Sequence, residues 1–291
     1  MRRLCAACLL AAVVSVSNAS AQQQQKRQLK DLFELQWMFR TRGEPAEDTG
    51  EPGRVTFAAA APVFFTSNAP QEPGGGQSDC YFGPWVLAEW ARQFANGPRF
   101  HVGASYTDYF YLRHPDLNYA YAEVYTGLSR TWRQSKSASL SAYGGLAFDY
   151  DLKSDYTTDD FEPSASVGLV LDLDAGRGHS FYCTPDLTLL RALPEASAAN
   201  SYLAATLTAG WRWQVLRTLC LGAYWKGSLS RYPFGTVEND LTQYVGAEIE
   251  WQITRTLALA LTCIQTINWS SQPSSEYDDL TAGLALRTRL P

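Results

Sequence analysis

A two-residue alternation of apolar and polar side chains runs through most of this chain and leaves few folds open to it. It is clearest in residues 202–215, where Leu203 and every second residue after it, up to Val215, is Leu, Ala, Trp or Val. The residues between them are Ala, Thr, Gly, Arg and Gln. Successive side chains of a strand point to opposite faces, whereas a helix would spread these polar residues around its circumference. The pattern therefore predicts a β-strand that is apolar on one face only.

The alternation recurs about twelve times after residue 53, in predicted strands of 11 to 15 residues. These strands are 54–66, 81–95, 98–112, 119–133, 137–151, 163–173, 180–192, 201–215, 218–231, 241–254, 256–269 and 279–290. The connections are alternately short (96–97, 134–136, 174–178, 216–217 and 254–255) and long (67–80, 113–118, 152–162, 193–200, 232–240 and 270–278). An up-and-down barrel with short turns at one end and longer loops at the other has this layout.

The composition and the apolar runs indicate how such strands could sit in a membrane. No stretch of 18 or more apolar residues follows residue 21, so the sequence offers no membrane-spanning helix. Inside lipid, only helices and closed barrels satisfy every backbone N–H and C=O group. Charged residues make up 18% of the chain, whereas soluble domains carry about 25%. We therefore predict a single all-β fold, a transmembrane antiparallel up-and-down β-barrel of about twelve strands in residues 54–291.

A soluble β-sandwich or lipocalin-like barrel also alternates, but it places the apolar face inside. The predicted strands are long enough to cross a bilayer at a tilt, whereas globular strands usually have about five or six residues. Several Trp residues also lie near strand ends on the side of the short turns, where an aromatic girdle would meet the membrane interface. They are Trp132, Trp211, Trp213 and Trp251. Both features favour the membrane barrel.

The first 53 residues differ from the rest of the chain. Arg2 and Arg3, the apolar run 4–14 and Ala19-Ser20-Ala21 predict a cleaved secretory signal in residues 1–21. Residues 22–53 form a polar leader, in which the apolar cluster within 28–40 fits a short helix or a strand equally well. Beyond the signal, Cys80 falls in a predicted loop, and Cys183, Cys220 and Cys263 fall in separate strands. Their spacing predicts isolated thiols, with no metal site and no cofactor.

Three stretches carry a resemblance to a known class of protein. They are the A-S-A cleavage site, the repeat L-A-A-T-L-T-A-G-W-R-W and the final strand L-T-A-G-L-A-L-R-T-R-L. From residue 21 to its end the chain resembles Gram-negative bacterial outer-membrane β-barrel proteins. The resemblance implies export to the outer membrane, with outer-membrane lipids, lipopolysaccharide and the outer-membrane assembly machinery as partners. Such barrels commonly end in an aromatic residue that the insertion machinery reads, and Leu290-Pro291 departs from that pattern.

The parity of the strands assigns their polar faces to the barrel lumen. Our candidates for a role in solute selectivity are Arg212, Lys226, Glu248, Glu250, Arg287, Arg289, Tyr224, Tyr244 and Glu123. The same parity places further polar residues inside, namely His101, Asp149, Asp186, Tyr109, Tyr111, Tyr119, Tyr121, Tyr125 and Tyr143. These charges either neutralise one another in a filled lumen or line a solute pathway whose selectivity they set.

A narrow channel or transport protein for small solutes, without catalytic residues, is the function that this lumen favours. A structural or adhesion barrel with a plugged lumen is one alternative, and an outer-membrane lipid-modifying hydrolase is another. For the hydrolase, His114 is the one histidine predicted near the outer side, and no recognisable Ser motif accompanies it. The paired carboxylates Asp159-Asp160 and Asp278-Asp279 are expected to be solvated loop charges. The net charge of −5, without a basic stripe, argues against a nucleic-acid partner.

Overall fold

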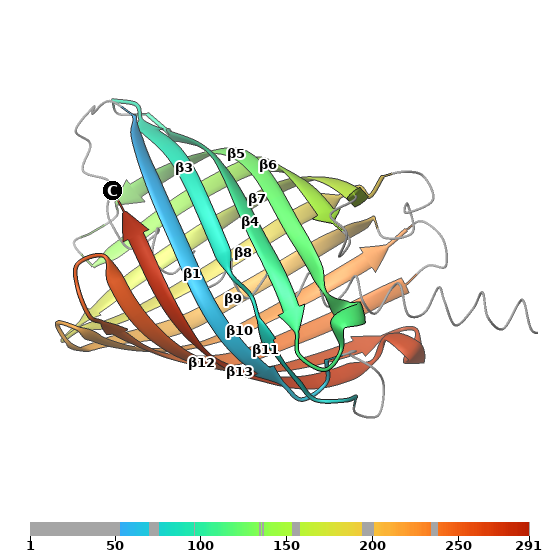
Figure 1. Ribbon diagram of the computed structural model, residues 1–291. Helices are drawn as coiled ribbons and strands as arrows, with labels where there is room; N and C mark the ends of the chain where they lie inside the picture. Colours follow the sequence, from blue (N-terminus) through green and yellow to red (C-terminus); the bar gives the residue numbers. More distant parts are fainter. Residues whose placement is uncertain are drawn as a thin grey trace, which may run out of the picture.

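The computed structural model describes residues 53–69, 76–95, 97–133, 135, 137–152, 158–193, 201–233 and 238–290 (Figure 1). The predicted signal peptide and all of the predicted leader except Gly53 lie outside the described residues. The strands are β1 (Arg54–Thr66), β2 (Asp79–Phe82), β3 (Trp85–Gln93), β4 (Arg99–Tyr111), β5 (Tyr119–Arg133), β6 (Ala138–Leu152), β7 (Thr158–Gly176), β8 (His179–Leu190), β9 (Tyr202–Leu216), β10 (Leu219–Tyr232), β11 (Glu238–Gln252), β12 (Leu257–Ser270) and β13 (Tyr277–Leu290).

The strands form one antiparallel sheet that closes on itself. Except for β2 and β3, which do not pair with each other, each strand pairs with its neighbours in the chain, and β1 pairs with β13, from Phe57 opposite Leu290 to Thr66 opposite Thr281. β2 and β3 together occupy one position between β1 and β4. The barrel therefore has twelve strand positions, which confirms the predicted fold. Closure leaves no sheet edge, so every strand finds hydrogen-bonding partners on both sides.

Two sequence predictions about the second strand position were wrong. The predicted single strand 81–95 is broken at Gly83-Pro84, where β2 ends and β3 begins. Proline has no N–H to donate to a ladder, so the break falls where the sheet would lose a hydrogen bond. Cys80 was expected in a loop, but it lies in β2, opposite Phe65 of β1.

The two ends of the barrel differ in their connections. At the end that we call the turn end, short turns join β3 to β4, β5 to β6, β7 to β8, β9 to β10 and β11 to β12. The turn between β7 and β8, at Gly176, Arg177 and Gly178, uses three residues with positive φ. Longer connections lie at the opposite loop end and include two 3-10 helices, η1 (Pro115–Leu117) and η3 (Pro273–Ser275). This confirms the predicted alternation of short and long connections.

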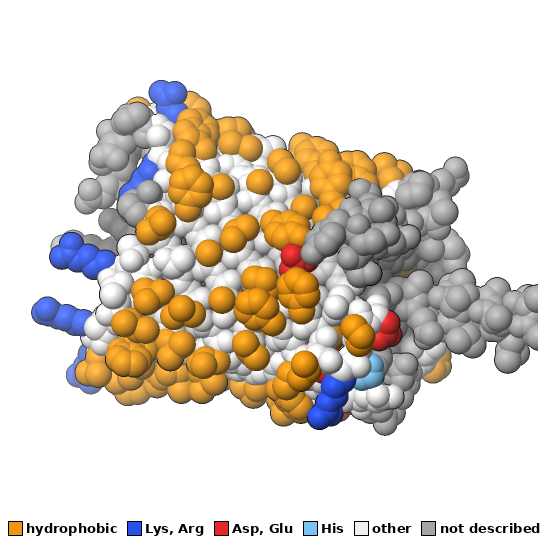
Figure 2. Space-filling view, viewed as in Figure 1, with side chains coloured by type: hydrophobic (Ala, Val, Ile, Leu, Met, Phe, Trp, Pro, Cys, Tyr) orange, Lys and Arg blue, Asp and Glu red, His pale blue; other side chains and the backbone are white. Residues whose placement is uncertain are grey.

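The apolar side chains of the strands point outward. Leu203, Leu207 and Leu261 are 50%, 40% and 51% exposed, and hydrophobic side chains cover much of the face seen in Figure 2. A soluble protein rarely exposes a contiguous apolar patch of such extent, whereas a lipid-facing barrel wall requires one. The predicted parity is therefore confirmed, and the apolar face is not an interior core. Among the described residues, no helix is both long enough and apolar enough to span a membrane.

Aromatic and basic side chains mark the outer surface near the turn end. The imidazole of His179 stacks on the indole rings of Trp211 and Trp213, at centroid distances of 5.8 and 5.2 Å. The indole N–H of Trp211 donates to His179 Nδ1 at 3.1 Å. The guanidinium of Arg130 lies over the ring of Trp132, 5.6 Å from its centroid. Rings with one polar tip suit the boundary between lipid and water, so these contacts fit the predicted girdle.

Candidate solute pathway in the barrel lumen

Eight of the nine predicted lumen residues lie on neighbouring strands. The register sets Arg212 of β9 and Glu248 of β11 on either side of Gly222 in β10, and it sets Lys226 opposite Tyr244. Tyr224, Glu250, Arg287 and Arg289 lie on the same inward face of β10, β11 and β13. Glu123 also faces the lumen, but it lies on β5, four to six strand positions away around the barrel. The structure therefore brings eight of the candidates to one wall and leaves Glu123 on the other.

An ion-paired cluster lies on this wall near the turn end. Arg287 Nη2 donates to Glu248 Oε2 at 2.7 Å, while Nη1 donates to Glu248 Oε1 at 3.2 Å and to Glu250 Oε2 at 3.1 Å. The three side chains are only 8%, 16% and 17% exposed, so a fork of charge-assisted hydrogen bonds offsets their loss of hydration. The guanidinium therefore offsets part of the charge of the two carboxylates.

Small residues on β12 make this cluster possible. Ala258 lies opposite Arg287, and Ala260 lies opposite Glu250, and both alanines are fully covered. Because neither side chain extends beyond Cβ, the guanidinium of β13 can cross β12 and reach carboxylates on β11. The ion pair therefore depends on the alanines between its partners.

A pocket opens in the lumen beside this cluster. It is lined by Tyr182, Trp211, Arg212, Cys220, Gly222, Ala223, Tyr224, Glu248 and Glu250. Among the residues that line this pocket, Tyr182 was not named in the sequence analysis, and Cys220 was named only as an isolated thiol in a strand. Tyr182 shares its parity with Asp186, which was assigned to the lumen, so the signal for it was present in the sequence. The side chains around the pocket offer phenol rings, a thiol and charges of both signs to a solute.

The tyrosines of this wall lie across their neighbouring strands instead of pointing at the barrel axis. Tyr182 faces Gly210 across β8 and β9, and Tyr224 faces Gly246 across β10 and β11. A Cβ placed on either glycine would overlap the tyrosine ring. Glycine allows this approach because it has no side chain. The rings therefore cover the strand next to them.

At mid-lumen, Lys226 and Tyr244 connect the pocket to a second region. The Lys226 ammonium lies 5.3 Å from the centroid of the Tyr244 ring, a cation–π contact, and the lysine is 7% exposed. Tyr244 also belongs to a cluster of aromatic rings toward the loop end.

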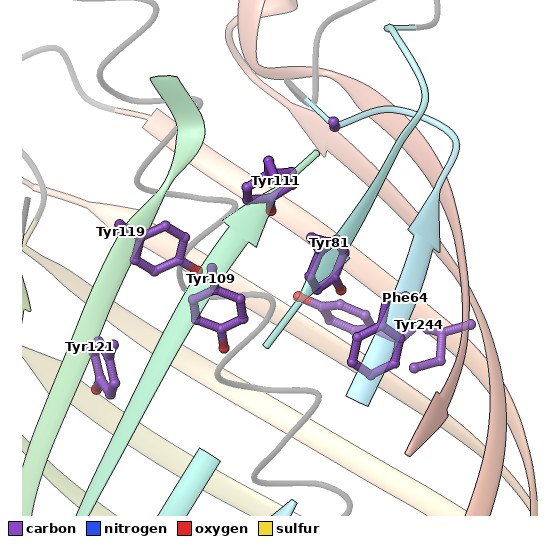
Figure 3. Close-up of a cluster of buried hydrophobic side chains, with 9 residues drawn as sticks. Phe64, Tyr81, Tyr109, Tyr111, Tyr119, Tyr121 and Tyr244 are labelled. Atoms are coloured by element: carbon purple, nitrogen blue, oxygen red, sulfur yellow. The ribbon is translucent and has the colours of Figure 1, made fainter. Parts of the chain in front are cut away.

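This aromatic cluster lines the inner wall near the loop end, mainly across β1, β2, β4 and β5, and Tyr244 joins it from β11 (Figure 3). Its rings form a chain of contacts, with centroids 5.2 Å apart for Phe64 and Tyr81, 5.1 Å for Tyr81 and Tyr111, and 4.5 Å for Tyr109 and Tyr119. All of these rings are buried. The inner wall near the loop end is therefore packed over these strands, whereas the pocket lies near the turn end, over β8 to β11.

Two buried carboxylates hold the loop-end connections in place. Asp279 Oδ1 accepts hydrogen bonds from the hydroxyls of Thr66 and Ser67 and from the backbone N–H groups of Ser67 and Asn68, at 2.8 to 3.0 Å. Asp79 accepts from the backbone N–H groups of Arg113 and His114, each at 3.0 Å. The expectation that Asp279 is a solvated loop charge was wrong, because the residue lies in β13 and is 5% exposed.

The opposite wall, on β5 to β8, is acidic. Glu123, Asp149 and Glu162 lie side by side in one row across β5, β6 and β7. Asp151, Asp172, Asp174 and Asp186 also have this inward parity. Of the side chains described on the lumen face of these four strands, none is Lys or Arg. The positive charges on the described lumen wall lie instead on β1, β4, β9, β10 and β13, with Arg54 at the start of β1.

No family model matches the chain, and no curated protein matches its sequence. Among solved structures, the NanC porin aligns with a TM-score of 0.47 at 8% identity, over 80% of this chain and 100% of that chain. The KdgM porin in complex with disordered oligogalacturonate aligns with a TM-score of 0.44 at 10% identity, over 79% and 98%. An outer membrane channel from Pseudomonas putida F1 aligns with a TM-score of 0.57 at 8% identity, over 85% of this chain and 99% of that chain. This chain therefore has the fold of the outer-membrane β-barrel proteins.

Proposed function

We propose that this protein is an outer-membrane channel for small polar solutes, with the turn end in the periplasm and the loop end outside the cell. The observation that carries the proposal is the lumen pocket beside Glu248 and Glu250, lined by phenol rings, a thiol and charges. Polar groups of this kind exchange hydrogen bonds with a solute that sheds part of its hydration shell. The proposal assigns no catalytic residue.

The outward apolar wall supports a position in the outer membrane. Bands of aromatic and basic side chains near the turn end would meet the phospholipid headgroups of the inner leaflet. The longer loop-end connections would then face lipopolysaccharide. Both assignments are part of the proposal.

Cys220 provides a direct test, because it is a free thiol that lines the lumen pocket. Purified protein in planar bilayers is expected to give discrete conductance steps. A charged, water-soluble methanethiosulfonate reagent added to the bath should attach to Cys220 and reduce each step. The Cys220→Ser variant is the matched control, and its conductance should not respond to the reagent. The other cysteines described, Cys80, Cys183 and Cys263, lie on the outward faces of their strands, away from the lumen. Folded protein without conductance steps would refute the channel.

A structural or adhesion barrel with a plugged lumen is the second candidate. The buried ring cluster near the loop end favours it, since Phe64, Tyr81 and Tyr109 are each 2% exposed. This candidate predicts that Cys220 reacts in detergent solution while no conductance is seen in bilayers. The bilayer experiment therefore separates the two functions.

A further inference from the structure

We propose that six lumen glycines set the free width of this channel by allowing aromatic and imidazole rings to lie flat against the barrel wall. The inference rests on the proposed channel function and deepens it, because it names the residues that control which solutes fit. Among the described residues, the pairs of ring and glycine are Tyr182–Gly210, Tyr224–Gly246, Tyr143–Gly168, Tyr125–Gly103, His101–Gly127 and Phe64–Gly283.

In every pair the ring and the glycine face each other directly on adjacent strands. A Cβ added to any of the six glycines would lie 2.6 Å or less from a ring atom, closer than real Cβ atoms come. The site of each glycine side chain is thus occupied by its neighbour's ring. The pairs join β13 to β1, β4 to β5, β6 to β7, β8 to β9 and β10 to β11, so they are distributed around the whole barrel.

The Tyr125 contact shows how far a ring reaches along the wall. Tyr125 lies on β5, and its ring crosses β4 above Gly103. Its hydroxyl donates to Glu89 Oε2 on β3 at 2.9 Å. The phenol therefore spans two strand spacings parallel to the wall and does not extend into the lumen.

A methyl group at such a glycine would remove the space that the ring uses. Side chains occupy a few staggered rotamers, and the backbone beneath the ring cannot yield. The ring would have to rotate away from the wall, and the direction left open to it is the barrel axis. Glycine to alanine substitutions should therefore narrow the lumen by moving a residue that is not itself changed.

A purely structural role is the competing explanation, because a ring over a glycine also stabilises strand pairing. The two explanations differ in their readouts. A structural role changes the unfolding free energy and leaves the lumen width as it is. A role in lumen width changes conductance and access to Cys220, and removal of the ring reverses that change.

The experiment compares Gly210→Ala and Gly246→Ala with Gly144→Ala. Gly144 lies on the outward face of β6, opposite Leu128 and Val167, and a Cβ there would meet only the Ser166 carbonyl oxygen, at 3.5 Å. We expect Gly210→Ala and Gly246→Ala to lower single-channel conductance by about twofold or more, and to slow the reaction of Cys220 with the methanethiosulfonate reagent. Gly144→Ala should match the wild type in both measurements. In the double variant Gly210→Ala/Tyr182→Ala, conductance and Cys220 reactivity should recover.

Each outcome has a definite consequence. Conductance and Cys220 reactivity unchanged in Gly210→Ala and Gly246→Ala would overturn the inference, as would equal losses in Gly144→Ala. A wild-type protein without conductance would refute the proposed function, while the rate of Cys220 modification in detergent solution would still test the inference. Circular dichroism of each variant checks that the barrel has folded. If Gly210→Ala alone does not fold, the double variant Gly210→Ala/Tyr182→Ala still tests the inference. In that variant Cys220 should react as fast as in the wild type, and a slower reaction would contradict the proposal.

Discussion

Single residues decide how the loop end of the barrel is held. Asp279 is an example, because one buried carboxylate accepts hydrogen bonds from three consecutive residues at the end of β1, Thr66 to Asn68, two of them through backbone N–H groups. Its neighbour Asp278 points outward and is exposed. The sequence pairs these two aspartates without distinguishing them. Their difference arises from the parity of β13 and from the path of the chain after Thr66.

We therefore expect Asp279→Ala to destabilise the barrel by about 3 kcal/mol, since it leaves buried N–H groups without an acceptor. Asp278→Ala is the matched control and should leave the unfolding free energy unchanged. The measurement is equilibrium unfolding in guanidinium of protein refolded into phospholipid vesicles. Equal stability of the two variants would show that the hydrogen bonds to Asp279 contribute little.

Arg287 is the second residue whose role can be isolated. Its guanidinium binds both Glu248 and Glu250. Arg287→Gln removes the positive charge and leaves two carboxylates in the pathway, so the reversal potential in a salt gradient should shift toward cation preference. Glu248→Lys with Glu250→Lys should shift it the other way. If neither variant moves the reversal potential, the ions do not pass this cluster.

At the scale of strands, the lipid-facing parity makes a quantitative prediction for β13. Leu284 and Leu290 lie on the same outward face and are 49% and 50% exposed, but Leu284 lies at the middle of the strand and Leu290 at its end. Leu284→Arg should cost about 2 to 4 kcal/mol, whereas Leu290→Arg should cost about 1 kcal/mol or less. Unfolding in vesicles measures both. Equal costs would argue that the middle of β13 is not in hydrocarbon.

Strand parity could be predicted because it depends only on which residues alternate. The break at Gly83-Pro84 was missed because the alternation continues through it, with Tyr81 and Leu87 both facing inward. A proline inside an alternating run was the available signal. The ring–glycine pairs were beyond prediction for another reason. They depend on register between strands, and the alternation of one strand does not fix which glycine faces which ring.

At the scale of the whole molecule, the charges on the lumen wall are unevenly distributed. Carboxylates occupy the described lumen face of β5 to β8, while the positive charges described there lie on other strands. Parity predicted which candidates face inward, including all nine selectivity candidates. It could not predict that Arg287 would reach Glu248 across β12, because that contact joins residues 39 positions apart through a third strand.

This distribution predicts that the channel prefers cations. In a potassium chloride gradient the reversal potential should have the sign of cation selectivity, and the preference should weaken at high salt as the charges are screened. Asp149→Asn with Glu162→Gln should reduce the preference, because both side chains lie in the row of carboxylates on β6 and β7. Anion selectivity in the wild type would contradict the prediction.

The seam between β1 and β13 has a consequence for the order of events in synthesis. It joins Phe57 to Leu290, the two extremes of the barrel sequence. Until the ribosome has released residue 290, the first strand has no permanent neighbour on one side, and its N–H and C=O groups are available to any other strand. The nascent protein must therefore be kept apart from its own copies until the barrel closes, and closure can follow only after the whole barrel sequence has been synthesised.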